Sequence, residues 1–337
     1  MKEKQHILLT GDRPTGKLHL GHFVGSLQER VAIQDDPTYD RRFVLIADIQ
    51  ALASHAGDPQ AIKDNVREVV LDYLSVGIDP QKTTICVQSA IPAIAELAIY
   101  FMNLVSVAQL QHNPTIKTEM KEKGFGASVP VGFLVHPVHQ AADILAFNAD
   151  RVPVGSDQEP IIEQTNDIVK KFNATYGETF SPVMSIISST SRLVGIDGKS
   201  KMSKSLGNAI FLSDSSKDVE EKVMSMYTDP SHIQVSDPGK VEGNTVFSYL
   251  DAFDPDVDGV SELKEQYKKG GLGDVVIKKR LIGVLETFLT PLREKRSLYE
   301  KDNQLIEDIL RKGTAEACTY TEEMMKKVRN TMGISYL

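Results

Sequence analysis

Continuous apolar runs and helical apolar repeats alternate over the first third of the chain. Three runs have the composition of strands that are buried on both faces of a sheet, at residues 7–10, 43–47 and 83–87. Apolar residues recur at helical spacing between these runs, over residues 20–31 and 62–74, and Pro92 begins a third helical pattern that extends to about residue 111. This order predicts a parallel sheet with helices on both faces.

The pattern changes beyond the third helix. Residues 112–129 are polar and lysine-bearing with two glycines, which predicts a mobile loop. A helix over residues 138–147, a strand over 151–154 and a helix over 159–172 follow. Beyond Leu212 the strand signals fade and amphipathic helices continue to the end. We therefore expect an α/β fold, a doubly wound parallel sheet followed by an all-helical C-terminal domain.

Composition and charge narrow the function classes. Of 337 residues, 41% are hydrophobic and 25% charged, which excludes a disordered or fibrous chain. No apolar stretch reaches the roughly 18 residues of a spanning helix, and the polar N-terminus lacks signal-peptide anatomy, so we expect a cytoplasmic protein. Cys86 and Cys318 form neither a disulfide framework nor a zinc cluster. The net charge is −8, yet residues 268–337 carry 14 Lys and Arg against 10 Asp and Glu, which fits either nucleic-acid binding or exposed helices of mixed charge.

The turn after the first strand carries the first candidate chemistry. Its sequence from Gly11 onward resembles a G-x-x-x-x-G-K-S/T phosphate loop, but Leu18 offers no hydroxyl to Mg²⁺. The tetrad His19-Leu20-Gly21-His22 follows at a helix start and places both imidazoles on one helical face. Gly21 leaves room for a nucleotide base, and neutral imidazoles can donate to phosphate oxygens. Two helix histidines without any functional role would give the same four-residue sequence.

The pentapeptide Lys201-Met202-Ser203-Lys204-Ser205 is the second candidate motif. Two lysines three residues apart form a flexible cationic clamp for a triphosphate whose pyrophosphate must leave. A lysine-rich loop is ordinarily solvated surface. This pentapeptide follows the histidine tetrad by about 180 residues, and the combination favours catalysis.

The two motifs resemble the HIGH and KMSKS signatures of class I aminoacyl-tRNA synthetases. Over nearly all its length the chain is similar to the bacterial tryptophanyl-tRNA synthetase family, most clearly at residues 11–22, 141–145, 152–158, 313–317 and 332–333. The resemblance implies a catalytic Rossmann domain over residues 1–212, with an inserted helical segment at about 90–140 and the KMSKS loop at 195–207. It also implies a helical anticodon-binding region with a terminal helix over residues 213–337.

The resemblance further implies roles for individual residues. The catalytic set is His19, His22, Lys201 and Lys204. The residues that match ATP-binding positions are Arg13, Pro14, Thr15, Gly21, His22, Gly155, Ser156, Asp157, Arg192, Lys201, Met202, Ser203, Lys204 and Ser205. The residues that match tryptophan-binding positions are Leu9, Gln50, His136, Gln140, Asp143 and Gln158. Asp143 matches the carboxylate that accepts the indole N–H, and one of Lys117, Lys121 and Lys123 matches a loop lysine that meets phosphates.

Several pocket positions depart from the commoner bacterial form of the family. That form has asparagine at the position of His22, histidine at Gln50, tyrosine at His136, methionine at Gln140 and phenylalanine at Leu9. Asp143 is kept. The chain therefore resembles a divergent bacterial subtype with an altered pocket lining.

The function implied is that of a tryptophan–tRNA ligase, which uses ATP with Mg²⁺, L-tryptophan and tRNA(Trp). The family implies a homodimer, no zinc, no organic cofactor and no membrane. Three alternatives stay open: a tyrosyl-tRNA synthetase, a tRNA-independent nucleotidyltransferase with a similar His-x-Gly-His turn, and a non-catalytic synthetase-like RNA-binding regulator. Without the resemblance, Asp143 is better explained as a helix cap or ion-pair partner, and Gln158 as a surface residue at a helix start.

Overall fold

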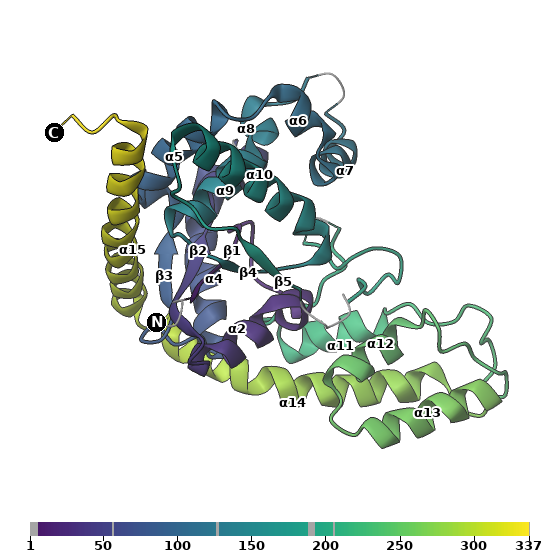
Figure 1. Cartoon of the computed structure of the whole chain (residues 1–337). Coiled ribbons are helices and arrows are strands. Elements are labelled where there is room, and N and C mark those ends of the chain that lie inside the picture. Colours follow the sequence, from purple (N-terminus) through teal and green to yellow (C-terminus); the bar gives the residue numbers. More distant parts are fainter. Residues whose placement is uncertain (1–5, 56, 126–127, 188–192, 205, 337) are drawn as a thin grey trace.

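The computed structural model describes residues 6–55, 57–125, 128–187, 193–204 and 206–336. Its centre is a five-stranded sheet with the order β3-β2-β1-β4-β5 (Figure 1). All four strand pairs are parallel. The strands are β1 (His6–Asp12), β2 (Tyr39–Ile46), β3 (Thr84–Val87), β4 (Arg151–Val154) and β5 (Met184–Ile187). The predicted doubly wound parallel sheet is confirmed, and its strand order reverses at β1, where such sheets bind ligands.

Helices separate the strands and form the C-terminal part of the described chain. Those before β4 are α1 (Leu20–His22), α2 (Gln28–Ala32), α3 (Asp48–His55), α4 (Pro59–Val76), α5 (Pro92–Met102), α6 (Val107–His112), α7 (Pro114–Lys123), α8 (Val131–Leu134) and α9 (His136–Ala146). Those after β4 are α10 (Glu159–Tyr176), α11 (Ser216–Met224), α12 (Thr245–Phe253), α13 (Val257–Lys269), α14 (Asp274–Glu300) and α15 (Asn303–Met332). A π-helical turn (Phe23–Leu27) joins α1 to α2, and short 3₁₀ turns cover Ile33–Asp35, Gln88–Ala90 and Ser156–Gln158. The predicted helical C-terminal part is confirmed.

Successive residues of β2 pack into two different cores. Val44 and Ile46 join a cluster with residues of α4, α12 and α14, whereas Phe43 and Leu45 join a cluster with residues of α5, α9, α10 and α15. Side chains alternate between the faces of a strand, so an apolar run without polar interruptions needs apolar cover on both sides. This arrangement explains the continuous run over residues 43–47.

The segment predicted as a loop over residues 112–129 is largely helical, and that prediction was wrong. The Asn113 side chain caps α7 by accepting hydrogen bonds from the backbone N–H groups of Thr115 (3.0 Å) and Ile116 (3.4 Å). Pro114 occupies the first turn, Ile116 is fully buried, and Gly124 ends the helix in the left-handed region. The capping signals outweigh the polar composition. The single helix predicted from Pro92 to about residue 111 is two helices, α5 and α6.

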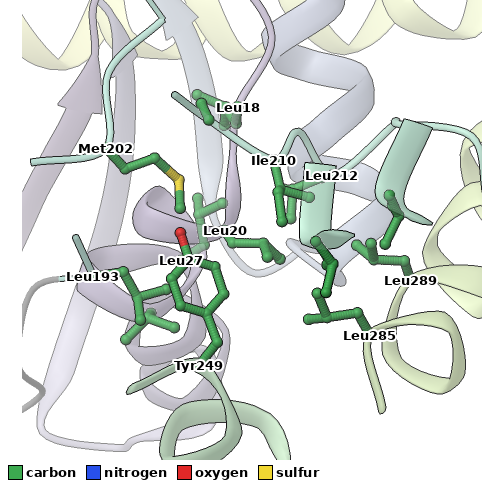
Figure 2. Packing of buried hydrophobic residues seen from close by; sticks show 14 of the residues in the cluster. Leu18, Leu20, Leu27, Leu193, Met202, Ile210, Leu212, Tyr249, Leu285 and Leu289 are labelled. Atoms are coloured by element: carbon green, nitrogen blue, oxygen red, sulfur yellow. The ribbon is translucent and has the colours of Figure 1, made fainter. Parts of the chain in front are cut away.

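The first core cluster joins the signature segments to the C-terminal helices. Figure 2 shows its residues Leu18, Leu20, Leu27, Leu193, Met202, Ile210, Leu212, Tyr249, Leu285 and Leu289. Leu20 belongs to the histidine tetrad and Met202 to the KMSKS pentapeptide, while Leu285 and Leu289 lie on α14. The turn after β1, the KMSKS loop and α14 therefore share one buried core.

The last helix, α15, returns to the sheet and runs beside β3 (Figure 1). A Cβ atom at Gly313 would lie 2.1 Å from the backbone oxygen of Ile85, so only glycine permits this approach. Across the described residues, no helix combines the length and apolar character needed to cross a membrane.

Candidate active site

A cavity of about 330 Å³ opens at the carboxyl ends of β1 and β4, where the strand order reverses. All six residues predicted for tryptophan line it: Leu9, Gln50, His136, Gln140, Asp143 and Gln158. Of the residues predicted for ATP, Arg13, Thr15 and His22 also form part of its wall. The cavity therefore collects side chains from β1, α3, α9 and the start of α10.

Asp143 lies in the wall with only 3% of its surface exposed. Its Oδ1 atom accepts a hydrogen bond from Gln88 Nε2 (2.6 Å), and its Oδ2 atom accepts one from Gln50 Nε2. His139 Nδ1 stands 3.7 Å from Oδ1. Burial raises the pKa of Asp143, while hydrogen bonds from His139, Gln88 and Gln50 oppose that rise. These contacts fix an acceptor at the cavity wall. The pair with His139, four residues earlier on α9, is the within-helix pairing that the alternative explanation of Asp143 expected, and it stands beside the two glutamine contacts.

Gln88 and His139 are site residues that the sequence analysis missed. Gln88 directly follows β3, at the sheet edge where functional side chains gather. Its Oε1 atom accepts a hydrogen bond from the Gln50 backbone N–H (3.2 Å), so it orients both Gln50 and Asp143. The position of Gln88 after a strand and the i, i+4 spacing of His139 and Asp143 were the signals available.

His136 is buried in the same wall. Burial, and then the nearby Arg13 charge, lowers the pKa of His136 to about 3. The imidazole is therefore neutral near neutral pH and offers one donor and one acceptor.

His19 and His22 form a close pair at the start of α1. Their ring centroids lie 3.8 Å apart, and His22 Nδ1 accepts a hydrogen bond from the His19 backbone N–H (3.2 Å). Burial is the main cause that lowers the pKa of His19 to about 2 and that of His22 to about 3. Both rings are therefore neutral near neutral pH, which suits donation to phosphate rather than charge pairing.

The KMSKS segment rests directly on the histidine tetrad. The Gly21 backbone N–H donates to Met202 Sδ (3.3 Å), and a Cβ atom at Gly21 would lie 3.0 Å from the His19 ring. Met202 and His19 therefore lie beside the position predicted for a base at Gly21, which keeps part of its surface exposed.

The two motif lysines differ in environment. Lys204 Nζ donates to the backbone oxygen of Gly16 (2.6 Å), and burial lowers the pKa of Lys204 to about 8. The Lys201 side chain is 64% exposed, with Nζ 4.0 Å from Asp157 Oδ2. Lys204 is thus held at the turn after β1, while Lys201 extends from the loop into solvent.

Asn208 holds the KMSKS loop in shape and was not predicted. Its Oδ1 atom accepts a hydrogen bond from the Ser203 backbone N–H (2.8 Å), and its Nδ2 atom donates to Asp197 Oδ1 (3.2 Å). The segment that follows Asn208 also pairs with the histidine tetrad, because the Leu20 backbone N–H donates to the Ile210 backbone oxygen (2.9 Å). The loop and the tetrad are therefore fixed relative to each other by backbone as well as side-chain bonds.

Some predicted positions cannot be placed in the cavity. Arg192 and Ser205 lie outside the described residues, as do the side chains of Ser156 and Lys123. Lys117 and Lys121 are exposed on α7 and do not line the cavity, whereas Glu119 of the same helix does. The described residues contain no group of three or more His, Cys, Asp or Glu side chains that could hold a metal ion.

The fold and the paired motifs define a class I aminoacyl-tRNA synthetase. The family model for class I tRNA synthetases (W and Y) matches residues 1–290, and the chain belongs to this family. The chain is similar to tryptophan–tRNA ligases from Streptococcus mutans (54% identity over 336 residues, 98% of each chain) and Lactococcus lactis (52% over 335 residues, 98% of each chain). A crystal structure of tryptophanyl-tRNA synthetase from Campylobacter jejuni with ADP and tryptophan has a TM-score of 0.85 at 31% identity, covering 97% of this chain and 99% of that one.

Proposed function

We propose that this chain is a tryptophan–tRNA ligase, which joins tryptophan to tRNA(Trp) at the expense of ATP. The observation that carries the proposal is the cavity itself, because its wall contains both the buried acceptor Asp143 and His22 of the histidine tetrad. Relatives named as tryptophan–tRNA ligases at 52% identity and above favour tryptophan over tyrosine.

In the first step, the tryptophan carboxylate attacks the α-phosphorus of ATP and pyrophosphate leaves. A bond forms between a carboxylate oxygen and phosphorus, and the bond to the pyrophosphate oxygen breaks. No general base is needed because the carboxylate is already ionised. Catalysis then consists of positioning and of stabilising charge on the phosphates. His19, His22, Lys201 and Lys204 provide that stabilisation, together with the Mg²⁺ ion that enters with ATP.

Indole recognition follows from the arrangement around Asp143. An indole ring has one polar group, its N–H donor, so a selective pocket needs an acceptor at that point. Two amide groups, from Gln50 and Gln88, already hold the Asp143 carboxylate in place. A carboxylate retains lone pairs beyond these two bonds, and one of them receives the indole N–H.

In the second step, a ribose hydroxyl at the 3′ end of the tRNA accepts the tryptophanyl group and AMP leaves. We assign residues 1–212 to catalysis and residues 213–337 to the anticodon, with α15 packed back on β3. The excess of Lys and Arg over residues 268–337 supports an RNA contact there. Aminoacylation serves protein synthesis, so we expect the protein in the cytoplasm.

Aminoacylation of tRNA tests this proposal against its alternatives. We expect tryptophan, ATP and tRNA(Trp) together to give charged tRNA. A nucleotidyltransferase would turn over ATP without any tRNA product, and a regulator would bind RNA without ATP–pyrophosphate exchange. Either result would contradict the proposed function.

We expect the protein to be a homodimer. Exposed apolar side chains mark the segment between β3 and β4, among them Ile99 (58% exposed), Val107 (59%) and Val131 (74%). A symmetric interface over this segment would cover them. Light scattering should give twice the chain mass of 37.2 kDa, whereas a stable monomer at micromolar concentration would contradict the expectation.

We also expect a fall in kcat/KM for ATP as the pH rises through about 8. Lys204 must carry its charge to stabilise phosphates, and its pKa of about 8 means that the ammonium is lost above that pH. Lys204→Arg should remove this alkaline fall, because the guanidinium remains charged. A wild-type profile that stays flat through this range would show that free Lys204 does not titrate there.

A further inference from the structure

Three carboxylates line the cavity among the described residues, and two of them are already engaged. Asp12 Oδ2 accepts hydrogen bonds from Arg30 Nη1 (2.6 Å) and Tyr73 OH (2.7 Å). Asp143 accepts its bonds from Gln50 and Gln88. The third carboxylate, Glu119, has a buried Oε2 atom that receives no hydrogen bond within the described structure. A buried acceptor without a partner is costly, so this oxygen is suited to a ligand donor.

Helix α7 holds Glu119 at the cavity through contacts on its first turn. Thr115 Oγ1 donates to the backbone oxygen of Asp157 (2.8 Å), and Asn113 Nδ2 donates to Gln164 Oε1 (2.9 Å). Residues four apart share a helix face, so Thr115 and Glu119 both face the start of α10. Gln158 lies at that start and lines the same cavity. Glu119 is thus fixed on the side of the cavity that Gln158 occupies.

The substrates of the proposed function offer few donors that match a carboxylate with a buried, unbonded oxygen such as Glu119 Oε2. Tryptophan and ATP together contain one cationic group, the α-ammonium of the amino acid. Its three N–H donors need acceptors, and Gln158, which lines the same cavity, offers one neutral amide oxygen. A charged acceptor gives a stronger bond than a neutral one and leaves no uncompensated buried charge.

We propose that Glu119 binds the α-ammonium group of the amino-acid substrate. This inference rests on the proposed function, because it assumes that tryptophan occupies the cavity. Pairing the ammonium with Glu119 anchors the substrate at a second point, besides the indole contact with Asp143. Two anchors orient the carboxylate toward the α-phosphorus of ATP, which favours attack.

The test compares two ligands on two proteins. Tryptophan carries the ammonium, whereas 3-indolepropionic acid has the same ring and carboxylate without it. The chain contains no tryptophan residue, so ligand indole fluorescence, excited at wavelengths that its ten tyrosines do not absorb, can be followed in binding titrations without indole emission from the protein. The variant is Glu119→Gln, and the matched control is Glu163→Gln, the same change at an exposed residue of α10.

We expect Glu119→Gln to weaken tryptophan binding roughly ten- to a hundredfold, the range for a hydrogen bond to a charged group. Binding of 3-indolepropionic acid should change less than about threefold, and so should ATP binding. Glu163→Gln should change none of the three affinities. The ratio between the two indole ligands isolates the ammonium contact from any general effect on folding.

Three outcomes would overturn the inference. An unchanged tryptophan affinity, or an equal loss of affinity for both indole ligands, would show that Glu119 does not bind the ammonium group. A selective loss of ATP affinity would place Glu119 at the ribose or the phosphates instead. In each case, a wild-type protein that still supports tryptophan-dependent ATP–pyrophosphate exchange would leave the proposed function intact, whereas absence of that exchange would refute the function itself.

Discussion

Asp143→Ala is expected to depress tryptophan activation strongly and to narrow the preference for tryptophan over phenylalanine. The change removes the acceptor for the indole N–H and leaves the Gln50 and Gln88 amides without their shared partner. An unsatisfied buried polar group costs about 1–3 kcal/mol, so kcat/KM for tryptophan should fall roughly ten- to a hundredfold or more. Phenylalanine has no ring donor and loses little, and sites of this type otherwise reject such analogues by up to about 10⁵.

The measurement is ATP–pyrophosphate exchange with tryptophan, tyrosine and phenylalanine on wild type and variant. Tyrosine is the harder competitor because its hydroxyl can also donate to Asp143, so shape must exclude it. Asp143→Asn is the matched control, since it retains one acceptor oxygen at nearly the same position and should keep more activity than alanine. A variant with an undiminished preference for tryptophan would remove Asp143 from the recognition role.

Lys204→Ala and Lys201→Ala are each expected to slow adenylate formation by about 10²–10³, the usual loss when one charge-stabilising donor is removed. Negative charge moves onto the departing pyrophosphate, so the lysines matter more in the transition state than in the ATP complex. The binding of ATP should therefore weaken less than the rate falls. Lys204 starts from its contact with the Gly16 oxygen and must exchange that partner for phosphate.

Single-turnover measurements of adenylate formation separate the two effects. Lys199→Ala is a suitable control because Lys199 is exposed in the same loop and lies outside the pentapeptide. It should leave both the rate and the ATP affinity unchanged. If either motif variant raised only the Michaelis constant for ATP, that lysine would bind the ground state and would not stabilise the transition state.

The sheet was predictable because its strands are short apolar runs covered on both faces. Phe43 to Ile46 alternate between two cores, and no polar residue is tolerated on either side. Helix α4 was equally predictable. The Asp58 side chain caps it by accepting a hydrogen bond from the Ala61 backbone N–H (3.0 Å), and Gly77 ends it with φ of 105°. Helix α7 was missed because its polar composition outweighed the Asn113 and Pro114 start signals in the prediction.

The motifs located the site, but the sequence could not supply its tertiary partners. Gln88 and Gln50 come from separate elements, and only the fold brings their amides to Asp143. The contact between Gly21 and Met202 joins residues 181 positions apart, and Asn208 joins the Ser203 backbone to the Asp197 side chain only once the loop has folded. Periodicity describes each element's buried face, whereas these contacts depend on where separate elements meet.

ATP–pyrophosphate exchange with each of the twenty amino acids is the decisive test of which amino acid this site activates. It requires only the folded catalytic site and reports which carboxylate the site activates, without any tRNA. We expect exchange with tryptophan far above that with tyrosine, phenylalanine or any other amino acid. A stronger exchange with tyrosine, or none with any of the twenty, would contradict the assignment as a tryptophan–tRNA ligase.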